Sequence, residues 1–415
     1  MKDYLPRLVD PLLTVLFHDL PVLNVTGPRA AGKTTTAARL VRDVIHLDDK
    51  LVGGLFRADP DAALGQVREP ALLDEWQTTP DVLGAVKRTV DIDSSPGRFI
   101  LTGSADASIT TQQWAGTGRL VDVPLYGLSV REILTRPFEN LFCDRLALGS
   151  VDALVPADSM TAAPTIIDYL GHACVGGFPE SVAARSDVAR RHWLESYVAH
   201  LLQRDVFLLG TSPNRRHLGA YLTALASHSA SVVESLTLSQ AANITSKTAA
   251  VYDDLLQRLF VIDLVPAWWT SRLSRLTQAP KRYVVDPALV PAVLRLDLQG
   301  ITRNVHLIGG LLDTFVAAQI RAELAVSRTH PTMHHLRDQG GRHEIDLVLE
   351  YPLGRVAGIE IKAAGAVDAS DARHLAWLRD KVGDDFIGGV VLHTGPGSFK
   401  LGDRLFAAPI STIWA

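Results

Sequence analysis

Residues 22–35 read VLNVTGPRAAGKTT, and this stretch decides the fold of the N-terminal part of the chain. An apolar run at residues 22–26 is followed by the pattern GxxxxGKT at residues 27–34 and then by a helical stretch. A glycine-rich loop between a strand and a helix wraps phosphates with its backbone N–H groups. The pattern therefore predicts a phosphate-binding loop that takes ATP.

Two side chains of this loop carry charge or a metal ligand. We expect Lys33 to reach the β- and γ-phosphates and the Thr34 hydroxyl to ligate Mg²⁺. The residues expected to contact the nucleotide are Gly27, Pro28, Arg29, Ala30, Ala31, Gly32, Lys33, Thr34 and Thr35. The predicted cofactors are thus ATP and Mg²⁺.

A second motif supports this assignment. Residues 71–75 read ALLDE, an apolar strand that ends in two acids, as in a Walker B motif. We expect Asp74 to hold Mg²⁺ through water and Glu75 to orient or deprotonate the attacking water, because in-line displacement at the γ-phosphate needs a positioned nucleophile. The alternative is a surface strand end with two solvated acids.

Weaker candidates lie further along the chain. Residues 98–102 form a predicted strand that ends at Thr102, and Ser104 follows two residues later. Thr102 or Ser104 at this strand tip is a candidate contact of the γ-phosphate or the water. Arg119 precedes another strand and is a candidate cation for the γ-phosphate of its own or a neighbouring subunit. A simple turn and a plain surface arginine are the alternatives.

Strand-like runs at residues 22–26, 71–73, 98–102 and 120–125 alternate with helical stretches, which predicts an α/β fold with a parallel sheet. The chain has 415 residues, of which 47% are hydrophobic and 21% charged, so two or three folded domains are expected. We predict a P-loop ATPase domain at residues 1–150, a helical region at 165–295 and a small α/β domain at 300–415.

The helical region closes with a winged-helix-like pattern. Residues 238–245 and 246–259 have helix, turn, helix spacing, with 260–265 as a wing strand. The second helix carries equal numbers of basic and acidic side chains, and the whole chain has a formal net charge of -4. Because phosphate contacts dominate DNA affinity, a structural or protein-binding role is favoured over DNA binding.

The C-terminal region contains two apolar strands that carry charged side chains. Asp346 lies on the first strand, and Glu360 and Lys362 lie on one face of the second. If the strands pair with Asp346 opposite, two carboxylates suit a hard cation and a lysine suits the water or leaving oxygen. Asp313 on the preceding helix is a further candidate acid. The alternative is a set of strand-edge charges that only form an ion pair.

Several segments taken together resemble the bacterial and archaeal AAA-type ATPases that carry a C-terminal DUF4143 region. In the ATPase part they are Arg7–Asp10, Thr26–Thr35, Leu73–Gln77, Phe99–Ser104 and Gly118–Arg119. Beyond it they are Leu125–Glu132, Gly176–Glu180 and Tyr197–Val206. The resemblance implies an AAA-type sheet with a sensor position at Thr102 or Ser104, followed by a fold similar to the PD-(D/E)xK nucleases. The family helix usually carries Glu where this chain has Asp313.

These observations favour a Mg²⁺-dependent ATPase that couples ATP hydrolysis to conformational change of a nuclease-like module. An ATP-regulated nucleic-acid-binding protein, a metal-dependent nuclease and a non-enzymatic nucleotide-dependent binding protein are the alternatives. Two cysteines, no signal-peptide pattern and no long apolar run predict a cytoplasmic location without membrane contact. The partners considered are ATP, a DNA or protein partner and a homo-oligomer.

Overall fold

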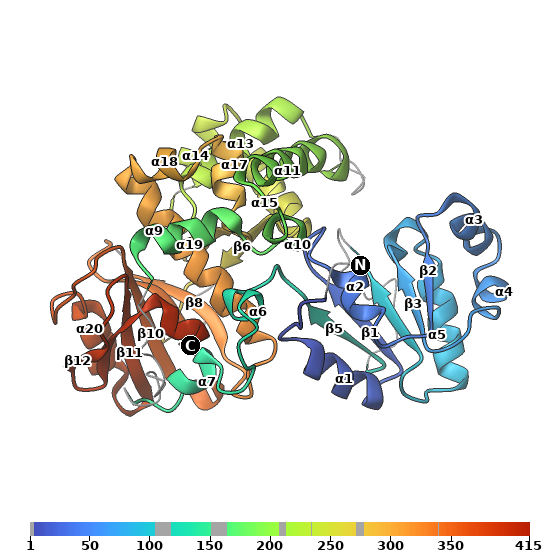
Figure 1. The fold of residues 1–415 in the computed structure, drawn as a ribbon, viewed down its shortest axis with the longest axis horizontal. Coiled ribbons are helices and arrows are strands. Elements are labelled where there is room, and N and C mark those ends of the chain that lie inside the picture. The colour runs from blue at the N-terminus through green and yellow to red at the C-terminus, as the bar shows by residue number, and fades with distance from the viewer. Residues whose placement is uncertain are drawn as a thin grey trace.

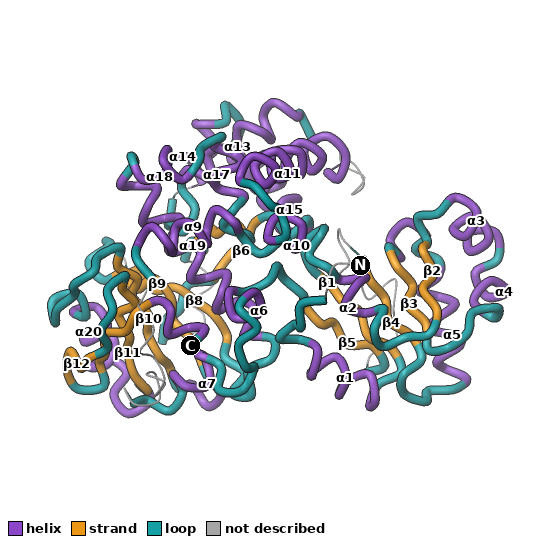
Figure 2. Tube along the Cα trace, viewed as in Figure 1, coloured by secondary structure: helices purple, strands orange, loops and turns teal. Residues whose placement is uncertain are grey.

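The computed structural model describes residues 4–103, 118–150, 164–206, 213–233, 235–270, 278–338 and 340–415. Figure 1 shows an N-terminal sheet with its helices in blue, a C-terminal sheet in orange to red, and a group of green to yellow helices above them. In Figure 2 the strands gather mainly in the two lateral sheets, with the short strand β6 between them.

The N-terminal part is built on a five-stranded parallel sheet in the order β2-β3-β4-β1-β5. Its strands are β1 (Val22–Thr26), β2 (Asp43–His46), β3 (Ala71–Asp74), β4 (Phe99–Thr102) and β5 (Leu120–Pro124). Its helices are α1 (Asp10–Asp19), α2 (Lys33–Ala37), α3 (Lys50–Ala58), α4 (Pro60–Leu64) and α5 (Val82–Ile92). The predicted α/β parallel sheet is therefore confirmed.

The position of each strand in the sheet follows from its side chains. Every residue of β1, β3 and β4 is buried, as expected for central strands covered on both faces. Strand β2 lies at the edge and alternates between half-buried and exposed residues. It is absent from the sequence prediction because it lacks a continuous apolar run.

Helices dominate the middle of the chain. They are α9 (Ile166–Val175), α10 (Pro179–Val182), α11 (Asp187–His200), α13 (Arg215–Ser227), α14 (Ser235–Ala241), α15 (Ser246–Arg258), α17 (Leu289–Leu294) and α18 (Leu298–Thr302). A π-helical turn, η2 (Leu201–Asp205), follows α11. Strands β6 (Ile262–Val265) and β7 (Lys281–Val284) pair antiparallel after α15. A winged-helix assignment for α14, α15 and this hairpin stays an interpretation.

The C-terminal part is a six-stranded mixed sheet in the order β12-β13-β11-β10-β9-β8. Its strands are β8 (Thr332–Arg337), β9 (Glu344–Glu350), β10 (Val356–Lys362), β11 (Phe386–His393), β12 (Phe399–Gly402) and β13 (Leu405–Pro409). Its helices are α19 (Val305–Leu324) and α20 (Arg373–Val382). Helix α19 begins at Val305 because the Asn304 side chain accepts hydrogen bonds from the first helical N–H groups.

The largest apolar core joins segments far apart in sequence. It contains residues of α6 (Val130–Ile133), α7 (Phe142–Leu146), α19 and the strands of the C-terminal sheet. The ring centroid of Trp414 lies 5.9 Å from the ring centroid of Phe315 and 6.0 Å from that of Tyr169. Thus α6 and α7, which lie within the predicted range 1–150, pack in the core of the C-terminal half.

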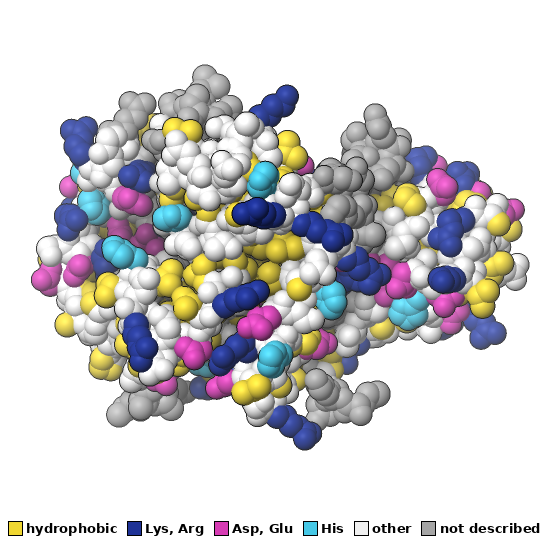
Figure 3. Space-filling model, turned by 90° about the horizontal axis from the view of Figure 1, so that it is seen from above, with side chains coloured by type: hydrophobic (Ala, Val, Ile, Leu, Met, Phe, Trp, Pro, Cys, Tyr) yellow, Lys and Arg dark blue, Asp and Glu magenta, His cyan; other side chains and the backbone are white. Residues whose placement is uncertain are grey.

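Two properties of the surface bear on partners. Among the described helices, none is both long and apolar enough to span a bilayer. On the face drawn in Figure 3, Lys and Arg side chains are interspersed with acidic, histidine and apolar ones.

Candidate nucleotide-binding site

The phosphate loop joins β1 to α2 and depends on its glycines. Gly27 has φ +142° and Gly32 has φ +93°, conformations that side chains disfavour. A Cβ atom on Gly27 would lie 2.0 Å from the carbonyl oxygen of Leu125, so no other residue fits there. Gly27 therefore packs directly against the Leu125 backbone, which fixes the start of the loop.

Lys33 is the buried cation of this loop, with a residue exposure of 6%. Its Nζ donates hydrogen bonds to the carbonyl oxygens of Gly27 at 2.9 Å and Pro28 at 2.8 Å. Burial lowers the pKa of Lys33 to about 8. These two acceptors carry no formal charge, so the ammonium is positioned to gain from an anionic ligand.

Asp74 ends β3 and collects hydroxyl groups from its neighbours. Its Oδ1 accepts hydrogen bonds from Thr34 Oγ1 at 2.8 Å and from Thr102 Oγ1 at 2.6 Å. Its Oδ2 lies 3.1 Å from Nδ1 of His46 at the end of β2. The structure thus brings Thr34 and Asp74 together at the carboxyl ends of parallel strands. An oxygen-rich group of this kind suits Mg²⁺.

Glu75 follows directly, with φ +55° in the left-handed region. The Gln77 side-chain amide donates a hydrogen bond to the Glu75 carboxylate, and the Thr78 hydroxyl donates to its carbonyl oxygen at 2.8 Å. The short 3-10 helix Trp76–Thr78 therefore holds Glu75 beside Asp74. Gln77 has no predicted role from the sequence, and the one signal for it is its place two residues after Glu75.

Of the other two catalytic candidates, the structure describes only Arg119, because Ser104 lies outside the described residues. Arg119 forms an ion pair with Asp91 near the end of α5. Strand β5 starts one residue later and runs parallel to β1, with Leu120 beside Val22. Arg119 therefore lies about 13 Å of strand length from the edge that carries the phosphate loop, and a role within its own subunit is not supported.

The outer side of the phosphate loop contacts the helical region. Arg29 Nη1 donates to Asp205 Oδ1 of the π-helical turn at 2.5 Å, and the Tyr197 hydroxyl donates to the Arg29 carbonyl oxygen at 3.3 Å. A pocket of about 290 Å³ adjoins this contact and is lined by Arg29, Trp193 and Arg204 among others. Arg29 is thus engaged by the helical region rather than by solvent alone.

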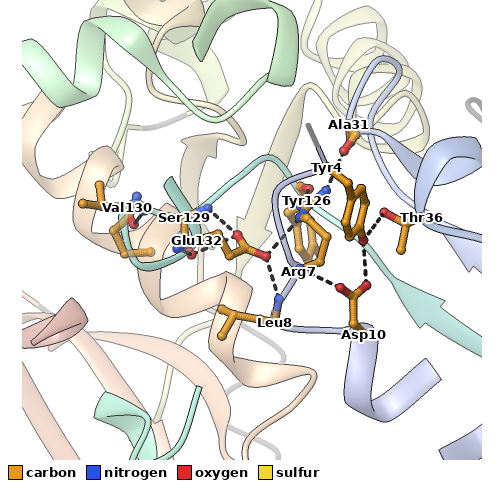
Figure 4. A network of polar contacts seen from close by, with 11 residues as sticks. Tyr4, Arg7, Leu8, Asp10, Ala31, Thr36, Tyr126, Ser129, Val130 and Glu132 are labelled. Atoms are coloured by element: carbon orange, nitrogen blue, oxygen red, sulfur yellow. Dashed lines mark hydrogen bonds and ion pairs between the residues drawn. The ribbon is translucent and has the colours of Figure 1, made fainter. Parts of the chain in front are cut away.

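A buried ion pair supports the loop from the inner side (Figure 4). Arg7 donates from Nε to Glu132 Oε1 at 3.0 Å, from Nη1 to the Ala31 carbonyl at 2.9 Å and from Nη2 to the Tyr126 carbonyl at 2.6 Å. The Glu132 carboxylate also accepts from Ser129, with its backbone N at 2.6 Å and its hydroxyl at 2.9 Å. The Arg7–Glu132 pair could not be predicted from the sequence, because the two residues are 125 positions apart.

The same short helix reaches the C-terminal half. The backbone N of Val130 donates to Gln319 Oε1 of α19 at 2.7 Å. Hydrogen bonds of Arg7 and Glu132 therefore join the phosphate loop to Ser129, and the next residue, Val130, bonds to α19.

In the C-terminal sheet, the structure brings the candidate acids together. Strands β9 and β10 pair with Leu347 opposite Ile359, so Asp346 and Glu360 lie on one face. Asp346 Oδ2 accepts from the Ile361 backbone N at 3.0 Å, and Lys362 Nζ lies 3.2 Å from Glu360 Oε2.

Asp313 of α19 joins this cluster through Lys281 of β7, which the sequence analysis does not mention. Lys281 Nζ lies 3.9 Å from Asp313 Oδ2 and 3.0 Å from Asp346 Oδ1. No group of three or more acidic, histidine or cysteine side chains in the described parts of the chain is arranged to hold a metal ion.

Three family models match the chain. An AAA domain matches residues 19–134, a domain of unknown function, DUF8612, matches 166–300, and a second domain of unknown function, DUF4143, matches 308–413. The AAA match covers the phosphate loop, Asp74 and Glu75.

The curated relatives are two uncharacterized proteins, Mb2031c of Mycobacterium bovis and Rv2008c of Mycobacterium tuberculosis. Each is 27% identical over 403 residues, which is 95% of this chain and 81% of the relative. Among solved structures, the Walker-type ATPase PABY2304 of Pyrococcus abyssi is similar at 12% identity and a TM-score of 0.41, covering 69% of this chain and 94% of that one.

The family matches agree with the parallel sheet and the phosphate loop, and none of them describes a nuclease. The chain is an ATP-binding protein with an AAA-type P-loop domain followed by a DUF4143 region.

Proposed function

We propose that this chain hydrolyses ATP with Mg²⁺ at the site formed by the phosphate loop, Asp74 and Glu75. The observation that carries the proposal is the Asp74 carboxylate, which holds the hydroxyls of Thr34 and Thr102 at 2.8 and 2.6 Å beside the phosphate loop. This arrangement supports a metal site next to a buried cation.

Each residue has a defined part in the proposed reaction. Lys33 would exchange its carbonyl partners for the negatively charged phosphate oxygens of ATP. Thr34 and Asp74 would hold Mg²⁺, which would supply positive charge beside the phosphates. Glu75, held by Gln77, orients the attacking water and accepts its proton.

The contacts of the loop support a coupling of nucleotide state to the rest of the chain. Arg29 binds Asp205 in the helical region, and Arg7 binds the carbonyl of Ala31 and the Glu132 carboxylate. A nucleotide that moves the loop changes both contacts. We therefore propose that ATP binding and hydrolysis reposition the helical and DUF4143 regions relative to the ATPase domain.

The test compares ATP binding and turnover in the wild type, Lys33→Ala and the control Lys87→Ala. Lys87 lies on α5 and pairs with Asp91 at 2.7 Å, away from the loop. Lys33→Ala should weaken ATP binding by about 10- to 100-fold, since hydrogen bonds to charged groups contribute about 1.5–3 kcal/mol. Normal ATP affinity in a folded Lys33→Ala protein would refute the assignment.

The alternative of an ATP-regulated nucleic-acid-binding protein is addressed in the same assay. Turnover is measured with and without single- and double-stranded DNA and RNA. Stimulation by one of them identifies the partner class, whereas unchanged turnover favours a protein partner or a second copy of the chain.

A further inference from the structure

The carboxylate cluster of the C-terminal sheet contains a lysine from outside that sheet. Lys281 belongs to β7, in the range 166–300, whereas Asp313, Asp346 and Glu360 belong to the range 308–413. Its side chain is 2% exposed, and its Nζ donates to Asp346 Oδ1 at 3.0 Å. A buried ammonium of this kind needs a charged partner, and the Asp346 carboxylate supplies it.

The Lys281 ammonium occupies the space between two carboxylates in which a divalent metal ion would have to bind. Its Nζ lies 3.0 Å from an oxygen of Asp346 and 3.9 Å from one of Asp313, between the two carboxylates. A divalent ion bridging these acids requires oxygens at about 2.0–2.6 Å. The ammonium and such an ion therefore exclude each other.

Two ammonium groups offset most of the negative charge of the cluster without a metal. Three carboxylates face two ammonium groups, Lys281 and Lys362, and Lys362 Nζ lies 3.2 Å from Glu360 Oε2. Burial and the Asp346 charge raise the pKa of Glu360 to about 8. Burial and the same neighbour raise the pKa of Asp313 well above its usual range. Part of the negative charge is thus removed by protonation near neutral pH.

One polar atom of the cluster has no partner. Glu360 is 3% exposed, and its Oε1 makes no hydrogen bond. This buried oxygen is an unused ligand of a cluster whose cation is already supplied by Lys281.

We infer that the Lys281 ammonium is the resident cation of the Asp313–Asp346–Glu360 cluster, where it replaces a divalent metal and fastens the helical region to the DUF4143 region. Neighbouring contacts serve the same junction. The backbone N of Trp268 donates to the His335 carbonyl at 2.6 Å, and Arg337 Nη1 donates to the Val232 carbonyl at 3.1 Å. The cluster is an interdomain ion-pair site, and it is closed to phosphodiester cleavage while Lys281 occupies it.

The test measures Mn²⁺ binding to the full chain without nucleotide, by the loss of the free Mn²⁺ signal in electron paramagnetic resonance. All proteins carry Asp74→Asn, which removes the metal ligand of the ATP site. The background protein should bind no Mn²⁺ at the cluster. Adding Lys281→Met should create one Mn²⁺ site per chain, and adding Glu360→Gln to that protein should weaken or remove it.

The matched control is Lys247→Met, which replaces an exposed lysine of α15 in the same region. This variant should leave Mn²⁺ binding unchanged. The inference is overturned if the Asp74→Asn protein binds Mn²⁺ and Glu360→Gln abolishes that binding. It is also overturned if folded Lys281→Met protein gains no Mn²⁺ site. If Lys281→Met does not fold, the comparison of Asp74→Asn with and without Glu360→Gln still decides, because both should lack Mn²⁺ at the cluster.

A second readout uses supercoiled plasmid with the wild-type chain in Mg²⁺ or Mn²⁺, with and without ATP. The plasmid should stay intact. Cleavage that disappears in Asp346→Asn would show that a metal displaces Lys281 and would overturn the inference.

Discussion

The phosphate-loop site and the C-terminal carboxylate cluster each contain a buried lysine near acids, but the hydrogen-bond acceptors of the two lysines differ in charge. Lys33 donates to two backbone carbonyls, whereas Lys281 donates to a carboxylate. Burial lowers the pKa of Lys33 to about 8. Burial opposes the charge of Lys281 too, but neighbouring acidic groups, above all Tyr283 and Asp346, raise its pKa well above the ordinary value. A site with unpaired charge is suited to a ligand, and a site with paired charge is suited to hold two elements together.

The largest expected effect concerns turnover. Glu75→Gln should retain ATP binding but reduce hydrolysis by about 10²–10⁴-fold, because the amide binds water without accepting its proton. Steady-state phosphate release measures the effect. The matched variant Glu360→Gln should hydrolyse ATP at the wild-type rate. Equal losses in both variants would erase the distinction between the two sites.

The free energy of unfolding should depend more on the C-terminal cluster than on the phosphate-loop site. Asp346→Asn leaves the Lys281 ammonium buried without its carboxylate, which costs about 3–5 kcal/mol in comparable ion pairs. Asp74→Asn should cost far less, because Asp74 accepts hydroxyl hydrogen bonds that an amide oxygen also accepts. Thermal unfolding midpoints of the two variants give the comparison. A larger loss in Asp74→Asn than in Asp346→Asn would contradict it.

The lowered pKa of Lys33 predicts how ATP affinity depends on pH. Below about pH 8 the ammonium is already formed in the free protein. Above that pH the bound phosphates require proton uptake by Lys33, so affinity should fall by up to about tenfold per pH unit. Calorimetric titration in buffers of different ionisation enthalpy reports the uptake. Lys33→Met should bind weakly with no such slope, and proton release on binding would oppose the prediction.

The smallest effect is expected at the contact between the loop and the helical region. The Arg29 side chain is 40% exposed, so its ion pair with Asp205 contributes at most about 1 kcal/mol. Asp205→Asn should free Arg29 for the phosphates and tighten ATP binding by about two- to fivefold. Asp187→Asn, which breaks an exposed pair with Arg190, is the control and should change nothing. Weaker ATP binding in Asp205→Asn would instead assign Asp205 to loop support.

The sequence predicts those parts of the molecule whose signals are local. Strand β1 and the loop after it are adjacent in sequence, as are β3, Asp74 and Glu75, so a run of apolar residues with its terminal motif suffices. Strand β2 is not predicted from the sequence because half of its residues are exposed at the edge of the sheet. Register within β9 and β10 follows from alternation, and it correctly puts Asp346 on the face of Glu360.

Contacts between distant segments carry no such signal. Lys281 meets Asp346 across 65 positions, and its sequence KRYV is that of an ordinary strand. Arg119 also shows why position in the sequence does not suffice: it precedes β5 at the end of the sheet opposite the phosphate loop, so only a role at a neighbouring subunit stays a prediction. Topology had to be known before either residue could be placed.

The packing of α6 and α7 has a consequence for protein engineering. Phe142 and Leu146 share a core with Ile413, and Arg131 Nη2 donates to the Ile413 carbonyl at 2.8 Å. A chimera that exchanged residues 1–150 for those of a relative would remove Phe142 and Leu146 from the C-terminal core, whose other residues would remain. An exchange that ends between Leu125 and Ser129 would transplant the ATPase sheet and leave the host core whole, provided that the incoming segment keeps an arginine at position 7 to pair with Glu132.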